Sequence, residues 1–132
     1  MMMPVVDFEA RGDDRGQLVA LETGRQVPFE IRRVYYLTGL SPDRPRGFHA
    51  HRRLRQLAIC VAGSCRFVIE DRDGREEFTL STPTKGILIE PMVWHEMHDF
   101  SADCVLVVLA SEAYDEADYI RSYDEFLKAS RA

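Results

Sequence analysis

The sequence contains little of what a disulfide framework or a membrane segment would need. Its 132 residues include three cysteines, Cys60, Cys65 and Cys104, and no CxxC pair. An odd number of cysteines inside apolar segments predicts reduced, buried thiols, so we expect a cytoplasmic protein. No apolar run approaches the roughly 20 residues of a membrane-spanning helix, and Met1–Val6 is too short for a signal peptide.

Basic charge is also scarce. Seventeen Lys and Arg residues stand against twenty-two Asp and Glu residues, giving a net charge of -5. This balance argues against a nucleic-acid groove but leaves room for one phosphorylated ligand, which needs only a few arginines. The length predicts a single domain over residues 1–132.

Histidine is scarce too, and its four copies fall into two clusters. His49 and His51 lie in Arg46–His51 (RGFHAH), whereas His95 and His98 lie some 45 residues further on. If the first cluster is a strand, His49 and His51 project from the same face because side chains alternate. Two imidazoles on one wall indicate either a metal site or a proton-transfer site.

Short apolar segments separated by Gly, Pro and Asp turns predict strands through most of the chain. The clearest are Phe29–Leu37, Leu57–Val61, Cys65–Glu70 and Val105–Ala110. The Gly63-Ser64 turn between the second and third predicts that they form a hairpin. Many short strands of this kind indicate an all-β fold, an antiparallel sandwich or barrel.

The pattern changes near the C-terminus. Apolar residues recur at helical spacing in Asp115–Ala129, which predicts a short C-terminal helix. We expect the aromatic and acidic residues of Tyr114–Tyr123 to pack this helix and to form its solvated face.

The two histidine clusters resemble the two motifs of the cupin superfamily of jelly-roll barrels. The matching residues are His49, His51 and Gly63 in the first motif and, more loosely, Gly86, Pro91 and His95 in the second. Gln56 occupies the acidic position of the first motif. Because a neutral amide is a weak ligand that cannot offset the charge of a divalent cation, this departure favours proton transfer over metal binding.

Four segments carry a closer resemblance: Arg33–Tyr36 (RVYY), Arg46–His51 (RGFHAH), Pro91–Phe100 (PMVWHEMHDF) and Tyr114–Arg121 (YDEADYIR). As a set they resemble the sugar-nucleotide 3,4-ketoisomerases, which act on dTDP-4-keto-6-deoxyglucose, and the likeness runs from Arg15 to about Phe126. It implies a cupin-type jelly-roll antiparallel barrel without metal or other cofactor, in a homodimer that exchanges N-terminal strands. It also implies a role in deoxyamino-sugar biosynthesis for surface polysaccharide.

The ketoisomerase reaction suits histidine, whose pKa lies near working pH and permits both acid and base roles. We expect His51 to carry a proton from C3 to C4 of the sugar, with His49 orienting it or exchanging a proton with a sugar oxygen. Arg46 is the expected partner of the pyrophosphate. Arg15 is expected to reach the cavity if the first strands are exchanged between subunits.

Two aromatic residues and one histidine complete the expected substrate site. Tyr36 either donates to a sugar or phosphate oxygen or packs the sheet, and Trp94 either flanks the sugar or packs the barrel. Arg15 and His95 resemble the residues of family members that form the galacto product, so we expect the galacto epimer at C4. Two alternatives stay open: a metal-dependent cupin oxygenase using His49, His51 and His95, and a non-catalytic sugar-binding cupin.

Overall fold

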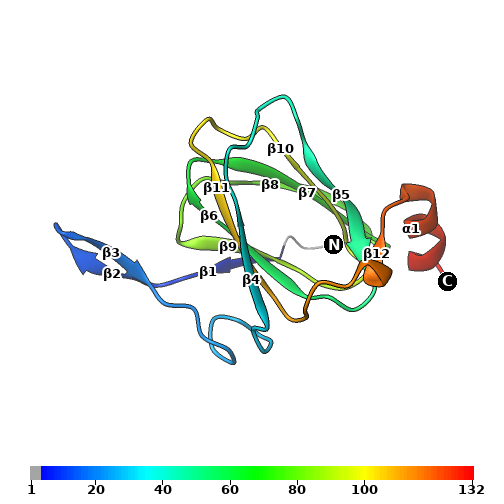
Figure 1. The fold of residues 1–132 in the computed structure, drawn as a ribbon, viewed down its shortest axis with the longest axis horizontal. Helices are drawn as coiled ribbons and strands as arrows, with labels where there is room; N and C mark the ends of the chain where they lie inside the picture. Colours follow the sequence, from blue (N-terminus) through cyan, green and yellow to red (C-terminus); the bar gives the residue numbers. More distant parts are fainter. Residues whose placement is uncertain (1–3) are drawn as a thin grey trace.

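The computed structural model describes residues 4–132 and consists mainly of two five-stranded antiparallel sheets facing one another (Figure 1). The first sheet has the order β1 (Val5–Asp7), β9 (Lys85–Ile89), β6 (Gln56–Ala62), β11 (Val105–Ala110), β4 (Arg33–Leu37). The second has the order β12 (Tyr119–Ile120), β5 (Arg46–His51), β10 (Trp94–His98), β7 (Cys65–Asp71), β8 (Gly74–Leu80). The predicted all-β jelly roll is confirmed, as a sandwich whose two sheets remain separate.

The predicted hairpin between β6 and β7 is wrong. Strand β6 pairs with β9 and β11 in the first sheet, whereas β7 pairs with β10 and β8 in the second. The turn between them carries the chain from one sheet to the other, and Gly63 in this turn has a φ of 71°. Apolar patterning identified both strands correctly but does not specify their partners, which depend on contacts distant in sequence.

The main core lies between the sheets. Its fully buried residues include Phe67, Leu80, Ile87 and Leu106, which come from β7, β8, β9 and β11. Each such side chain contributes roughly 1.5–3 kcal/mol of burial free energy, enough to hold the sheets together around a cavity. A second cluster covers the outer face of the first sheet, where Val27 and Phe29 pack on Leu57.

The predicted helix over Asp115–Ala129 is shorter than expected. Residues Glu116–Asp118 form a 3₁₀ turn, Tyr119–Ile120 form β12, and α1 spans Tyr123–Ser130. The side chain of Ser122 caps α1 by accepting a hydrogen bond from the Glu125 backbone N–H at 3.2 Å. The segment before the cap pairs with β5 instead of coiling, because that pairing extends the second sheet.

A separate hairpin, β2 (Ala10–Asp13) and β3 (Gly16–Val19), extends away from the two sheets (Figure 1). Leu18 on this hairpin is 61% exposed, which is unusual for an apolar side chain in a strand. Within residues 4–132, no helix is long and apolar enough to cross a membrane.

Candidate active site

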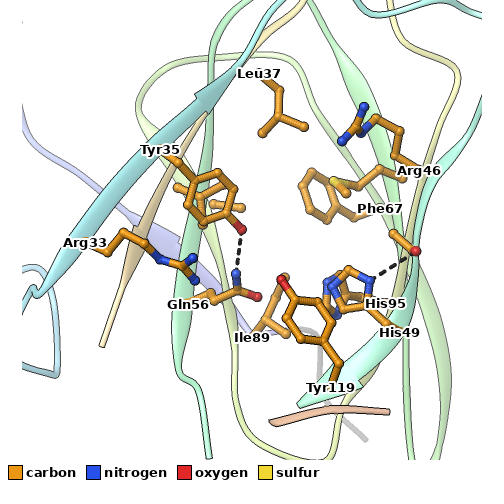
Figure 2. Close-up of a pocket in the computed structure, with 14 residues that line it drawn as sticks. Arg33, Tyr35, Leu37, Arg46, His49, Gln56, Phe67, Ile89, His95 and Tyr119 are labelled. Carbon is orange, nitrogen blue, oxygen red and sulfur yellow. Dashed lines mark hydrogen bonds between the residues drawn. The ribbon is translucent and has the colours of Figure 1, made fainter. Parts of the chain in front are cut away.

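A cavity of about 230 Å³ lies between the two sheets (Figure 2). Strands β5 and β10 of the second sheet supply one wall, and β4 and β6 of the first sheet supply the other. Its polar lining residues are Arg33, Tyr35, Arg46, His49, Gln56, His95 and Tyr119. The cavity therefore combines imidazole, phenol and guanidinium groups within a largely apolar space.

Strand β5 places its two histidines on one face, as the sequence predicts. The ring centroids of His49 and His51 are 5.0 Å apart, with the planes nearly perpendicular. The strand is irregular at its start, because Gly47 and Phe48 have φ values of 90° and 60°. A Cβ on Gly47 would lie 2.9 Å from the His95 carbonyl oxygen, so glycine permits the close approach of β5 to β10.

Strand β10 adds the third histidine. His95 pairs in register with His49, and the two ring centroids are 4.5 Å apart. Because side chains alternate, His95 and Met97 face the cavity while Trp94, Glu96 and His98 face outward. Three imidazoles from two neighbouring strands thus form one cluster.

Burial keeps these histidines uncharged. It lowers the pKa of His51 to about 4, with His49 acting in the same direction and Asp118 opposing it. It also lowers the pKa of His49 and brings the pKa of His95 well below its usual value. At neutral pH all three are therefore in the form that accepts a proton.

The hydrogen bond made by His49 assigns its tautomer. Its Nδ1 lies 3.1 Å from the carbonyl oxygen of Gly47, which can only accept a hydrogen bond (Figure 2). Nδ1 therefore carries the proton, and Nε2 has a free lone pair. This nitrogen can act as a base toward a bound molecule.

The opposite wall presents a protonated phenol. The Gln56 side-chain amide donates to the Tyr35 hydroxyl oxygen at 2.5 Å (Figure 2). Burial is the main cause that raises the pKa of Tyr35 to about 12, so its hydroxyl stays protonated. Because Gln56 fills the acceptor side, the Tyr35 proton remains available for a ligand oxygen.

Only some of the predicted site residues line this cavity. Arg46, His49 and His95 line it. His51, which is 3% exposed, is not among the residues that line it and instead lines a small side pocket with Arg33 and Tyr119. The two histidines of β5 thus line different pockets.

Three other predicted residues lie outside the cavity of this chain. Tyr36 is 72% exposed on the outer face of β4, because alternation turns Arg33 and Tyr35 inward instead. Trp94 packs against Phe126 behind the second sheet, so it takes the packing role. Arg15 lies on the projecting hairpin, where it pairs with Asp13.

Several polar residues that line or adjoin the cavity were not assigned to it from the sequence, and four of them bear on its chemistry. They are Arg33, Tyr35, Asp118 and Tyr119. The alternation of β4 contained the signal for the first two, since it places them together on the face opposite Tyr36. The last two lie in the segment we expected to be helical and solvated, whereas Asp118 is only 5% exposed.

The residues at the cupin ligand positions do not suit a metal ion. Gln56 directs its amide N–H groups toward Tyr35, leaving no anionic ligand at that position. Within residues 4–132, no group of three or more His, Cys, Asp or Glu side chains is arranged to hold a metal. The donor set instead suits proton transfer between neutral groups.

Comparisons with known proteins agree with this geometry. The family model described as "FdtA: WxcM-like, C-terminal" matches residues 1–131. The chain is 52% identical over 124 residues to a TDP-4-oxo-6-deoxy-alpha-D-glucose-3,4-oxoisomerase of Aneurinibacillus thermoaerophilus, covering 94% of this chain and 89% of that protein.

Solved structures show the same likeness in three dimensions. A 3,4-ketoisomerase from Helicobacter canadensis is 44% identical with a TM-score of 0.93, over 97% of this chain and 96% of that one. A histidine-to-asparagine mutant of the 3,4-ketoisomerase QdtA from Thermoanaerobacterium thermosaccharolyticum, in complex with TDP-4-keto-6-deoxyglucose, is 41% identical with a TM-score of 0.94, over 99% and 96%. With its length matched by the family model and by these relatives, the chain belongs to the WxcM-like FdtA family of sugar 3,4-ketoisomerases.

Proposed function

We propose that the protein converts dTDP-4-keto-6-deoxyglucose into dTDP-3-keto-6-deoxygalactose, a step toward deoxyamino sugars of surface polysaccharide. The observation that carries this is the cluster of neutral histidines facing a protonated tyrosine across one cavity. Such a site can remove and return protons without a cofactor. The 52% identity to a curated oxoisomerase supports the choice of substrate.

The proposed reaction is an internal exchange of a ketone and an alcohol. The C4 carbonyl acidifies the C3 hydrogen, and His51 takes that proton as the C3–C4 enediolate forms. The same proton equivalent is returned to C4, while the C3 hydroxyl proton leaves and O4 is protonated. The C3–H and C4=O groups become C3=O and C4–H, so the reaction needs no external oxidant or reductant.

His49 and Tyr35 suit the oxygen chemistry of this exchange. The free Nε2 of His49 can accept the C3 hydroxyl proton, and the Tyr35 hydroxyl can donate to an oxygen carrying developing charge. His49 lines the main cavity, where it can reach these oxygens, whereas His51 adjoins the smaller side pocket.

The galacto assignment depends on the face from which C4 receives its proton. In the gluco-configured substrate, the C3 hydrogen lies on the lower face of the ring. If one histidine returns the proton from that same face, the 4-hydroxyl becomes axial, which is the galacto arrangement. The three histidines support this route because they gather on a single wall.

The substrate's pyrophosphate needs cationic partners, and Arg46 and Arg33 at the cavity are suitably placed. Arg15 can serve a cavity only in a second copy, because its hairpin extends away from its own sheets (Figure 1). We therefore include in the proposal a homodimer of single-domain chains that exchange N-terminal strands. The exposed Leu18 on that hairpin supports such a contact.

We place the enzyme in the cytoplasm. Cys60, Cys65 and Cys104 are all buried and unpaired. The sulfur atoms of Cys60 and Cys104 lie 3.7 Å apart as a thiol contact, the form expected in a reducing compartment.

The test is incubation with dTDP-4-keto-6-deoxyglucose in deuterated water, followed by proton NMR with and without a chelator. We expect a 3-keto product with an axial 4-hydroxyl, formed at the same rate in both samples. An equatorial 4-hydroxyl would overturn the galacto assignment. Loss of turnover with chelator, restored by iron and accompanied by oxygen uptake, would favour the metal-dependent oxygenase. Binding of the sugar nucleotide without turnover would favour a non-catalytic cupin.

A further inference from the structure

Asp118 is a buried carboxylate that the reaction described above does not use. It is 5% exposed, and its Oδ2 lies 3.2 Å from Nδ1 of His51, which is 3% exposed. A carboxylate is costly to bury without partners, so its presence beside a buried imidazole requires an explanation.

Backbone contacts fix the position of this carboxylate. Its Oδ1 accepts a hydrogen bond from the Arg53 backbone N–H at 2.8 Å, and its Oδ2 accepts one from Leu54 at 3.1 Å. The Asp118 carbonyl accepts from the Arg52 N–H at 3.0 Å, and the next residue, Tyr119, pairs with His51 in the sheet. Hydrogen bonds thus hold Asp118 against the residues that directly follow His51 in the chain.

Several polar groups surround the His51 ring. His49 and His95 face it from β5 and β10, at centroid distances of 5.0 and 6.2 Å, and Tyr119 faces it from β12 at 4.3 Å. Arg33 of β4 lines the same side pocket. Among these neighbours within the described chain, Asp118 alone supplies a carboxylate to the ring.

The 3.2 Å contact is close but not yet aligned. Neither ring nitrogen of His51 has a hydrogen-bond partner of good geometry among residues 4–132. Hydrogen bonds at catalytic groups are commonly loose in the unliganded enzyme and tighten when substrate binds. At 3.2 Å, alignment of Nδ1–H with Oδ2 would complete a hydrogen bond.

We propose that Asp118 is the positioning residue of His51, holding the proton on Nδ1 so that Nε2 is the base in the reaction. This inference rests on the proposed isomerase function. A carboxylate at Nδ1 selects one tautomer of the neutral ring and stabilises the imidazolium that forms once the C3 proton has been taken. His51 is then a base whose proton-accepting atom is set before substrate arrives.

The first test needs no substrate. Nitrogen-15 NMR of ring-labelled protein distinguishes the two neutral tautomers, and the signals of His51 are those lost in a His51→Asn variant. We expect the Nδ1–H form in the wild type and a shift toward the Nε2–H form in Asp118→Asn. An Nε2–H tautomer in the wild type would overturn the proposal, whether or not the variant folds.

The second test is kinetic and uses a matched control. Asp115→Asn alters a carboxylate of the same segment that binds the Arg53 side chain at 2.8 Å and caps the Glu116–Asp118 turn, a role that the amide oxygen of asparagine can keep. We expect kcat to fall about 100-fold or more in Asp118→Asn, with KM changed less, and to stay near wild type in Asp115→Asn.

The pH profile separates positioning from a merely structural role. Because Asp118 raises the pKa of His51, its removal should move the acid limb of kcat/KM to lower pH. An unmoved acid limb, with activity lost only in proportion to folded protein, would show that Asp118 is structural. If the wild type fails to turn over the sugar nucleotide, the proposed function fails, while the NMR result still decides the role of Asp118.

Discussion

The two faces of strand β10 carry similar polar side chains in very different surroundings. On the outer face, Glu96 accepts hydrogen bonds from Trp94 Nε1 at 2.9 Å and from His98 Nε2 at 2.8 Å. Arg75 adds a further contact to Glu96 and binds Glu70 at 2.8 Å. On the inner face, the one hydrogen-bond contact of the His95 ring within residues 4–132 is a long one of 3.5 Å between Nδ1 and the Val93 carbonyl oxygen.

This difference supports a structural role for the outer face and the proposed chemical role for the inner one. The outer network closes on itself, so its polar groups need nothing from a ligand and mainly stabilise the sheet. The inner histidines have few partners within residues 4–132, and their burial favours the neutral form. Buried polar groups without partners cost free energy, and they are typical of sites that supply those partners through a substrate.

The largest expected effect comes from making the same substitution in the inner histidine cluster, on β5, and on the outer face of β10. His51→Asn should lower kcat by about 100-fold or more, because an amide cannot accept and return the proton. His98→Asn should leave kcat near the wild-type value, since His98 faces Glu96 outside the cavity. The measurement is turnover of the sugar nucleotide together with deuterium exchange at C3. A His51→Asn enzyme that exchanged the C3 hydrogen at the wild-type rate would remove His51 from the reaction.

A substitution in the outer network should act on stability instead. Glu96→Gln leaves imperfect partners for Trp94, His98 and Arg75, so we expect the free energy of unfolding to fall by about 1–3 kcal/mol. Urea denaturation measures this change, and kcat per folded enzyme should be unaltered.

The matched control for Glu96→Gln is Glu30→Gln, which alters an exposed pair with Arg32 and should change stability by less than about 0.5 kcal/mol. Equal losses of stability in the two variants would mean that the outer network adds nothing beyond a surface charge.

The smallest expected effect is a difference between the inner histidines and the outer face of β10 in the pH range over which each stabilises the folded protein. The pKa of a buried histidine is lower in the folded than in the unfolded protein, where it is about 6.5. Its contribution to stability is therefore full above pH 6.5 and is lost as the pH falls toward the folded value, which is about 4 for His51. The pKa of Glu96 is also lowered despite its burial, by its bonds to His98 and Trp94, so its contribution is lost only below about 4.5.

Stability measured between pH 7.5 and 4 should therefore begin to fall below pH 6.5 in the wild type. The slope between pH 6.5 and 4.5 should be shallower in His51→Asn, because one group that takes up a proton on unfolding has been removed. A flat profile down to pH 4.5 would contradict the neutral, buried state of the histidines.

Local patterns in the sequence predicted much of the fold and part of the site. Alternation along Arg46–His51 was sufficient to place His49 and His51 on one wall, and the turn-rich apolar segments were sufficient to predict an antiparallel sandwich or barrel. The jelly roll itself was implied by the resemblance to the cupin superfamily. Both depend on neighbours a few residues apart, which a single sequence displays directly.

The features that were missed depend on distant contacts. No local signal shows that β6 and β7 belong to different sheets, or that Asp118 is buried beside His51. The Tyr114–Tyr123 segment has helical spacing, yet pairing with β5 overrides that preference at Tyr119 and Ile120. Tertiary pairing of this kind outweighs the small free energies of local propensity.

The pairing of β12 with β5 joins residues that are made at different times during synthesis of the chain. His49 and His51 leave the ribosome early, and the strands between the two histidine clusters follow. The neighbours of His51 at positions 118 and 119 come much later. A chain that ended before residue 118 would therefore lack Asp118 and Tyr119 beside His51, together with the core residues Ile120 and Phe126 that cluster with Ala50 and Trp94.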